Sequence, residues 1–170
     1  MLISCLLLFF LLLFDQLTKY LTELFLNGPV VKELIPYVLS VTKVYNTGAA
    51  WSSFDGATVF LAIISLIASL VLVYFFTKNN WKRKKCYSIA ITCMLAGTYG
   101  NFIDRFFASF FPEYRPGVVD MIIFTPLDTL WEKIIGSSFP IFNVADVCLV
   151  IGVIFLVIDI LFFQERRAVK

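Results

Sequence analysis

Long apolar segments alternate with shorter polar ones along the chain. Four apolar segments cover residues 2–26, 57–77, 86–103 and 143–163. Each is close to the ~20 residues that a helix needs to cross a hydrocarbon core about 30 Å thick. A segment in lipid must satisfy its own backbone hydrogen bonds, which favours helices. The pattern predicts one integral membrane domain, residues 1–170, in the all-α membrane class, with a bundle of four transmembrane helices.

Two polar segments, residues 27–56 and 104–142, separate these predicted helices. Within the first, Val38 to Tyr45 alternates apolar and polar residues as a strand does. Gly48 follows in "NTGAAW" and suits a turn. The second segment contains four prolines, which predict a loop with short amphipathic pieces. A small extracytoplasmic sheet is therefore expected beside the helical bundle.

The distribution of Lys and Arg predicts the orientation. Five of the eight residues from 78 to 85 are basic, and three more basic residues lie in the last seven, 164–170. Positive charge is retained in the cytosol, so both termini and the 78–85 loop are expected there. The first apolar segment lacks the basic start and small-residue cleavage site of a signal peptide, which indicates a retained helix.

Composition limits the chemistry. Hydrophobic residues make up 60% of the chain and charged residues 15%, and there is no histidine. Histidine-based acid/base catalysis and histidine metal sites are thereby excluded. The net charge of +2 without a basic, aromatic patch gives no indication of nucleic-acid binding. We expect no metal and no cofactor. The four cysteines lie in apolar surroundings and are interpreted as buried small hydrophobic residues: Cys5, Cys86, Cys93 and Cys148.

Ionisable residues inside apolar segments are candidates for function, because each costs about 2.5–3.5 kcal/mol to insert. Asp15, Lys19 and Glu23 are spaced at i, i+4 and i+8 and share one helix face. One interpretation is a self-neutralised pair at the outer membrane interface. The other is a polar face turned toward a site within the bundle.

The third and fourth apolar segments carry similar candidates. Asn101 and Arg105 share a face, and Asp104 adjoins Arg105 and could pair with it as an interfacial cap. Asn143 and Asp146 are spaced at i, i+3 near the outer end of the last helix. Asn143 alone could be an N-terminal helix cap, whereas Asp146 lies too deep in the run to cap equally well.

Asp120 stands alone between apolar residues in "GVVDMIIF", a position compatible with plain loop chemistry. Six of the polar residues are expected together at the depth of the outer leaflet: Asp15, Asn101, Arg105, Asp120, Asn143 and Asp146. Asp159 is interpreted instead as interfacial, at the cytosolic end of the last apolar segment near Arg166 and Arg167. If Asp120 and Asp146 were about 4 Å apart, their repulsion would be roughly 4 kcal/mol at an effective dielectric of 20. One carboxyl would then keep its proton while the other stayed ionised and activated water.

Five motifs occur in order along nearly the whole chain and resemble those of one family. They are "DQLTK" (15–19), "YNTGAAW" (45–51), "GNFIDR" (100–105), "GVVDM" (117–121) and "FPIFNVAD" (139–146). On a layout of four spans, this series resembles the lipoprotein signal peptidases, also called signal peptidase II.

The resemblance implies an aspartic endopeptidase of the bacterial plasma membrane, with its active site near the outer leaflet and a small β-cradle. Such enzymes remove the signal peptide of diacylglyceryl-modified prolipoproteins, cutting before the lipidated cysteine without a cofactor. It implies Asp120 and Asp146 as the catalytic dyad. The residues it implies for support and substrate binding are Asp15, Lys19, Asn46, Gly48, Asn101, Arg105 and Asn143. It further implies contact with membrane lipids, a monomeric enzyme and inhibition by globomycin-type peptides.

The chain departs from the family pattern between Arg105 and Asp120. Fourteen residues separate them, about twice the usual spacing, and the role of this loop, 106–119, stays open. Met121 and Trp51 stand where phenylalanine is usual.

Three rival interpretations stay open at the level of sequence. An ion or proton transporter would also gather carboxylates in the membrane, with Asp159 continuing the path. A Ser–Lys protease would use Lys19 as the base, with Ser52, Ser53 or Ser137 as the nucleophile. A non-catalytic assembly factor gives no reason for the two acids.

Overall fold

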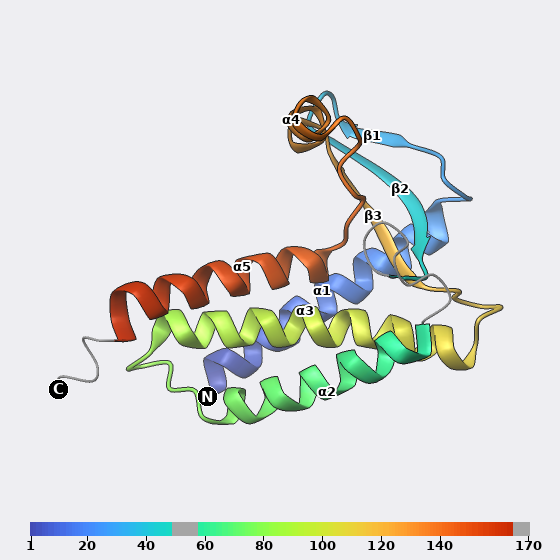
Figure 1. The fold of residues 1–170 in the computed structure, drawn as a ribbon. Coiled ribbons are helices and arrows are strands. Elements are labelled where there is room, and N and C mark those ends of the chain that lie inside the picture. Colours follow the sequence, from blue (N-terminus) through green and yellow to red (C-terminus); the bar gives the residue numbers. More distant parts are fainter. Residues whose placement is uncertain (49–57, 165–170) are drawn as a thin grey trace. The chain divides into compact units, whose positions relative to one another are not determined.

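The computed structural model describes residues 1–48 and 58–164, and these residues are mostly helical with one small sheet (Figure 1). In chain order the elements are α1 (Leu2–Phe25), β1 (Lys32–Ile35), β2 (Leu39–Asn46), α2 (Thr58–Thr77), α3 (Lys85–Phe110), β3 (Val118–Phe124), α4 (Thr125–Ile135), α5 (Val144–Asp159) and the π-helix η2 (Ile160–Gln164). The predictions concerning Trp51, Ser52, Ser53, Arg166 and Arg167 lie outside the described residues.

The chain divides into two compact units. The first unit comprises residues 1–15, 63–102 and 144–170, and the second comprises residues 16–62 and 103–143. The first unit is helical, whereas the second contains the sheet, α4 and the remaining ends of three helices. The single domain expected from the sequence stays a prediction.

Three helices are long and apolar enough to cross a membrane within the described ranges: α1, α2, and α5 continued by η2. Only 17–22% of the residues in their most apolar windows are buried, so most of their apolar side chains face outward, as contact with lipid requires. α3 has 26 residues but is not among them, because polar residues follow its apolar first half. The mostly helical membrane class is confirmed, and the count of four transmembrane helices stays a prediction.

Small residues bring α3 and α5 together in the first unit (Figure 1). A Cβ atom added at Gly97 would collide with the backbone carbonyl of Ala145, and one added at Gly152 would lie 2.8 Å from the backbone nitrogen of Met94. Glycine at both positions therefore permits a backbone approach that any larger residue would block. This packing holds the first turn of α5 against α3.

The sheet of the second unit has the order β1-β2-β3, with both pairs antiparallel. The main pairing joins β2 to β3 and sets Val44 opposite Asp120 and Asn46 opposite Val118. The strand expected at Val38–Tyr45 corresponds to β2. Val118 and Val119 are almost completely buried, so one end of β3 belongs to the core of this unit.

The segment 104–142 is more ordered than the sequence predicts. α3 continues to Phe110 instead of ending near Ile103, Asp120 lies in a strand, and α4 is a complete helix. Pro126 is in the first turn of α4, where a missing backbone N–H costs nothing. Gly136 ends that helix with a left-handed φ of 80°. The prolines therefore mark element boundaries and not a continuous loop.

Candidate functional site

Asp120 accepts hydrogen bonds from two asparagine side chains in the second unit. Asn143 Nδ2 donates to Oδ1 at 2.7 Å, and Asn46 Nδ2 donates to Oδ2 at 3.0 Å. Asp120 is 4% exposed and Asn143 is fully buried. Each carboxylate oxygen thus has an amide donor, which is the arrangement that stabilises an ionised carboxylate away from water.

Local backbone contacts position these three residues, which we call the Asp120 cluster. Phe142 forms an isolated bridge with Ile122, and its carbonyl accepts a hydrogen bond from the backbone N–H of Ile122 at 2.8 Å. The residue after Phe142 is consequently held beside β3. On the other side, a Cβ at Gly117 would lie 2.6 Å from the carbonyl oxygen of Asn46, so glycine allows β3 to begin close to Asn46.

The turn after β2 fixes the amide of Asn46. The backbone N–H of Gly48 donates to Asn46 Oδ1 at 3.2 Å. With its oxygen occupied in this way, the amide directs its NH₂ group toward Asp120. Gly48 is buried. Asn46 and Gly48, both expected as site residues, therefore act together on one carboxylate.

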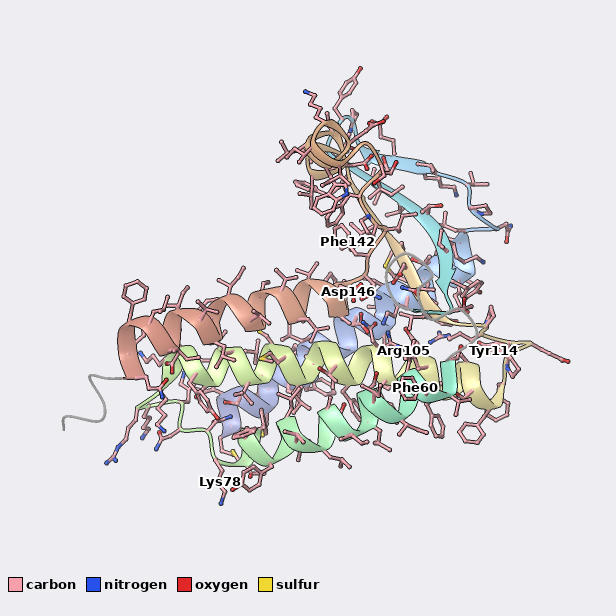
Figure 2. The ribbon with its side chains drawn as sticks, in the orientation of Figure 1. Phe60, Lys78, Arg105, Tyr114, Phe142 and Asp146 are labelled. Atoms are coloured by element: carbon pink, nitrogen blue, oxygen red, sulfur yellow. The ribbon has the colours of Figure 1, made fainter. Side chains whose placement is uncertain are left out.

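Asp146 lies in the first turn of α5, in the first unit (Figure 2). Asn101 Nδ2, on α3, donates to Asp146 Oδ1 at 2.9 Å. Asp146 is half-buried, whereas Asn101 is 5% exposed. Asp146 therefore resembles Asp120 in accepting a hydrogen bond from an asparagine side chain, in this case from the neighbouring helix α3.

Asp15, also in the first unit, binds the beginning of α5. Its Oδ1 accepts a hydrogen bond from the backbone N–H of Ala145 at 2.8 Å, and the side chain is 1% exposed. A carboxylate at this position satisfies a donor that the helix leaves unpaired and complements the positive end of the helix dipole. A Cβ at Gly100 would lie 2.6 Å from Asp15 Oδ2, so glycine makes room for the carboxylate. Asp15, Asn101 and Asp146 form the Asp146 cluster.

Four charged residues form a continuous network in the second unit. Lys19 Nζ lies 2.7 Å from Asp104 Oδ2, Arg115 Nη1 donates to Asp104 Oδ1, and Arg115 Nε lies 3.2 Å from Glu23 Oε1. Lys19 and Asp104 are fully buried. The network contains two cations and two anions, as burial of charge requires.

This network differs from the expectations for its members. Lys19 pairs with Asp104 on α3, and Glu23 pairs with Arg115, so both partners lie outside their own helix. Sequence reasoning missed Arg115 entirely and gave Asp104 only Arg105 as a partner. The available signal was Lys19 itself, because a lysine deep in an apolar segment requires a buried anion from elsewhere. Lys19 Nζ is thus in contact with a buried carboxylate, whereas Ser137, a candidate nucleophile of the rival Ser–Lys protease, is exposed.

Tyr45, on β2, adjoins the same network. Its pKa is raised above the usual 10.0, first by burial and then by the negative charge of Glu23, which also accepts a hydrogen bond from the phenol; the positive charge of Arg115 acts in the opposite direction. The tyrosine therefore stays neutral over the physiological range and serves as a hydrogen-bond donor.

The remaining expected site residue, Arg105, is half-buried near the end of α3 (Figure 2). Its backbone carbonyl accepts a hydrogen bond from Ser109 Oγ at 2.8 Å. Within residues 1–48 and 58–164, no group of three or more His, Cys, Asp or Glu side chains is arranged to hold a metal ion.

Comparison with known proteins gives one consistent result. A family model described as "Signal peptidase (SPase) II" matches residues 7–162. A lipoprotein signal peptidase of Enterococcus faecalis is 40% identical over 154 residues, covering 91% of this chain and 84% of that protein. One from Staphylococcus aureus strain JH9 is 39% identical over 158 residues, covering 93% and 87%.

Two solved structures have the same fold. Both are described as bacterial membrane enzyme structures obtained by the in meso method, one at 2.3 Å and one at 1.9 Å resolution. The first has a TM-score of 0.74 and 37% identity, covering 93% of this chain and 87% of the other. The second has a TM-score of 0.72 and 36% identity, covering 95% and 94%.

Proposed function

Because the chain belongs to the signal peptidase II family, we propose that it removes the signal peptide from prolipoproteins. The proposed reaction is hydrolysis of the peptide bond before the diacylglyceryl-modified cysteine, with Asp120 and Asp146 as an aspartic dyad. One observation above all supports the dyad. Asn143 stands three positions before Asp146 in the chain, and its hydrogen bond to Asp120 holds it beside β3.

The proposed chemistry needs one ionised and one protonated carboxyl. Asp120 accepts an amide hydrogen bond on each oxygen, which favours its ionised form, so we assign it the role of the base. It takes a proton from water as the water oxygen attacks the scissile carbonyl carbon. Asp146 donates its proton to the carbonyl oxygen, which becomes a hydroxyl of the tetrahedral intermediate.

Collapse of that intermediate breaks the C–N bond. The leaving nitrogen takes the proton that Asp120 removed from water, and the hydroxyl returns its proton to Asp146 as the carboxylic acid product forms. The dyad is thereby restored with its one proton, and no other reactant is needed. The supporting asparagines contribute by holding both carboxyl groups in orientations suited to these transfers.

The remaining expectations complete the proposal. Asp15, Lys19, Gly48 and Arg105 support the substrate and the dyad, and the enzyme acts as a monomer that globomycin-type peptides inhibit. It resides in the bacterial plasma membrane with both termini in the cytosol and the dyad near the outer leaflet, where the lipidated cysteine of a substrate lies. An Asn80→Cys variant should then react with a membrane-impermeant thiol reagent in inverted vesicles and not in intact cells; the reverse result would contradict this orientation.

Cleavage of a lipidated prolipoprotein by purified protein, followed by gel shift, tests the function. Asp120→Asn and Asp146→Asn should each abolish cleavage, while the matched acid-to-amide variant Glu132→Gln, at an exposed position on α4, cleaves normally. Full activity of either dyad variant would refute the mechanism. Absence of cleavage by the parent protein would refute the function itself, and activity that depended on an added metal ion would indicate a different mechanism.

A further inference from the structure

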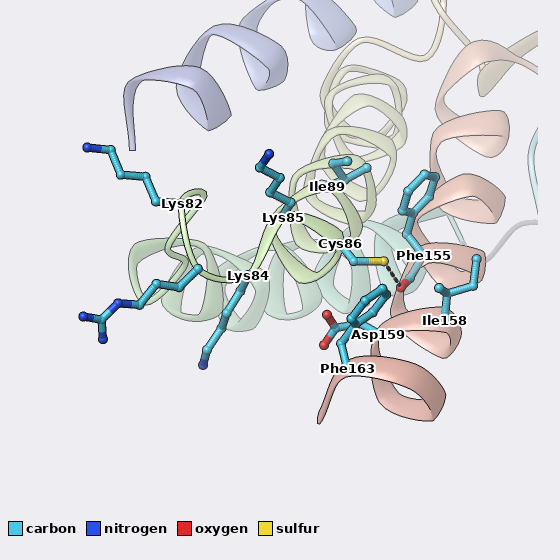
Figure 3. Close-up of a pocket in the computed structure, with 10 residues that line it drawn as sticks. Lys82, Lys84, Lys85, Cys86, Ile89, Phe155, Ile158, Asp159 and Phe163 are labelled. Atoms are coloured by element: carbon cyan, nitrogen blue, oxygen red, sulfur yellow. Dashed lines mark hydrogen bonds between the residues drawn. The ribbon is translucent and has the colours of Figure 1, made fainter. Parts of the chain in front are cut away.

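A cavity of about 1060 Å³ opens in the first unit, at the end of the unit where α3 begins and α5 ends (Figure 3). It belongs to none of the clusters described above. Ligand pockets in proteins typically measure about 300–1,000 Å³, so this one can hold a molecule of substantial size. Its lining comes from the loop before α3, the first two turns of α3, the end of α5 and η2.

One side of the cavity is strongly basic. The four consecutive residues from Lys82 to Lys85 contribute four cations, and Asp159 is the one acid among the lining residues, which leaves a formal charge of +3. Figure 3 shows Lys82 and Lys84 extending on one side of the view and Asp159 lying among the residues of α3 and α5. The excess of cations favours an anion as the occupant.

The other side of the cavity is apolar. Its apolar lining residues are Ile89 from α3, Phe155 and Ile158 from α5, and Phe163 from η2. The Cys86 thiol donates to the carbonyl oxygen of Phe155 at 3.2 Å, which joins α3 to α5 beside the cavity. These residues offer an apolar surface that continues along a helix long and apolar enough to span a membrane.

We propose that this cavity binds an anionic phospholipid. The phosphate lies against the basic residues 82–85, and an acyl chain lies along the apolar residues of α3, α5 and η2. Basic pockets between the ends of transmembrane helices are suited to such headgroups. Their cations lie at the membrane interface, where the phosphate is, while the acyl chain extends along the helices into the hydrocarbon core.

Two features separate a lipid from a soluble phosphate. The apolar residues would gain nothing from inorganic phosphate, whereas they remove the acyl chain from water. The cavity also opens where α5 ends, which is the depth of lipid headgroups if α5 spans the membrane. The lipid site is independent of the proposed catalytic function, because none of its residues belongs to the Asp120 or Asp146 cluster.

Native mass spectrometry of the detergent-purified full chain provides the test. Phosphatidylglycerol should bind more tightly than phosphatidylcholine with the same acyl chains. The Lys84→Gln/Lys85→Gln variant should lose roughly 25-fold in affinity for phosphatidylglycerol, since each basic residue near a headgroup contributes about fivefold. The matched variant Lys32→Gln/Lys133→Gln has the same net charge but alters exposed lysines outside the cavity, so it should bind like the parent.

A variant on the apolar side completes the test. Phe163→Ala shortens an exposed apolar side chain and leaves the charge of the protein unchanged. It should nevertheless weaken the binding of phosphatidylglycerol, because less apolar surface covers the acyl chain. Equal binding of the two lipids, or equal losses in both lysine double variants, would overturn the proposal in favour of bulk charge attraction. Displacement of the lipid by inorganic phosphate alone would overturn it in favour of a soluble anion.

Discussion

Asn143 Nδ2 lies 2.7 Å from Asp120 Oδ1, and both side chains are buried. The residue directly before α5 is thereby bonded to the strand that carries one of the two proposed catalytic carboxyl groups. A hydrogen bond to a buried charged group is worth more than one between neutral groups, because the alternative is an ion without a donor. The hydrogen bond therefore holds Asn143 beside β3, and it also favours the ionised form of Asp120.

Replacing Asn143 with alanine should lower kcat/KM for prolipoprotein cleavage roughly 10- to 150-fold, which corresponds to about 1.5–3 kcal/mol for a hydrogen bond to a charged group. The acidic limb of the pH–rate profile should also move to higher pH, because the ionised form of Asp120 loses a donor. Asn27→Ala, at an exposed position, serves as the matched control. A loss of rate with an unchanged pH profile would contradict an electrostatic role for Asn143.

The ion-pair network predicts an order of stabilities. Asp104→Asn removes two of the three ion pairs and leaves Lys19 and Arg115 without their shared anion, so it should cost about 3–5 kcal/mol of unfolding free energy. Lys19→Met removes one ion pair of the network and leaves Asp104 with Arg115 as a partner, so it should cost less. Unfolding of both variants in mixed micelles measures the difference. An equal or reversed order would show that the pairs do not act as a network.

Several buried polar residues could be singled out from the sequence because burial of polar groups is costly. Asp15, Asn101 and Asn143 each stood out as a polar residue in or beside an apolar segment. Each has a partner that satisfies it: Asn101 donates to Asp146, Asn143 donates to Asp120, and Asp15 accepts from a backbone N–H of α5. The energetic argument identifies such residues one at a time, without any knowledge of which atoms they contact.

Other features depend on pairings between distant segments, which local patterns do not encode. Arg115 lies between Pro112 and Pro116, and its local sequence suggests an exposed loop, yet it is 9% exposed and bonded to α3 and α1. Asp120 alternates with apolar residues too irregularly to indicate a strand, and β3 forms because β2 supplies its hydrogen bonds. The full length of α3, 26 residues, was not predicted either, because charged residues lie in its second half, and the partner of one of them, Asp104, comes from α1.

The close packing of α3 and α5 predicts a steric effect at Gly152. Gly152→Ala should lower the unfolding free energy by about 1–3 kcal/mol, because the new Cβ would meet the backbone of Met94 and the carbonyl of Ala90, which cannot rotate away. Val153→Leu adds a methylene at the next position, which is 48% exposed, and should be nearly neutral. Unfolding in mixed micelles compares the two, and an alanine tolerated as well as the leucine would contradict the packing.

The raised pKa of Tyr45 predicts how stability changes in alkaline solution. A tyrosine whose pKa is higher in the folded than in the unfolded state ionises first in the unfolded chain, so the folded state loses stability as pH rises above 10.0. Tyr45→Phe cannot ionise, and its unfolding free energy should therefore fall less steeply than that of the parent above this pH. Tyr37→Phe, which removes a hydroxyl at a position that is 85% exposed, is the matched control. Parallel curves for the parent and Tyr45→Phe would show that burial and Glu23 do not hold the Tyr45 phenol in its neutral form.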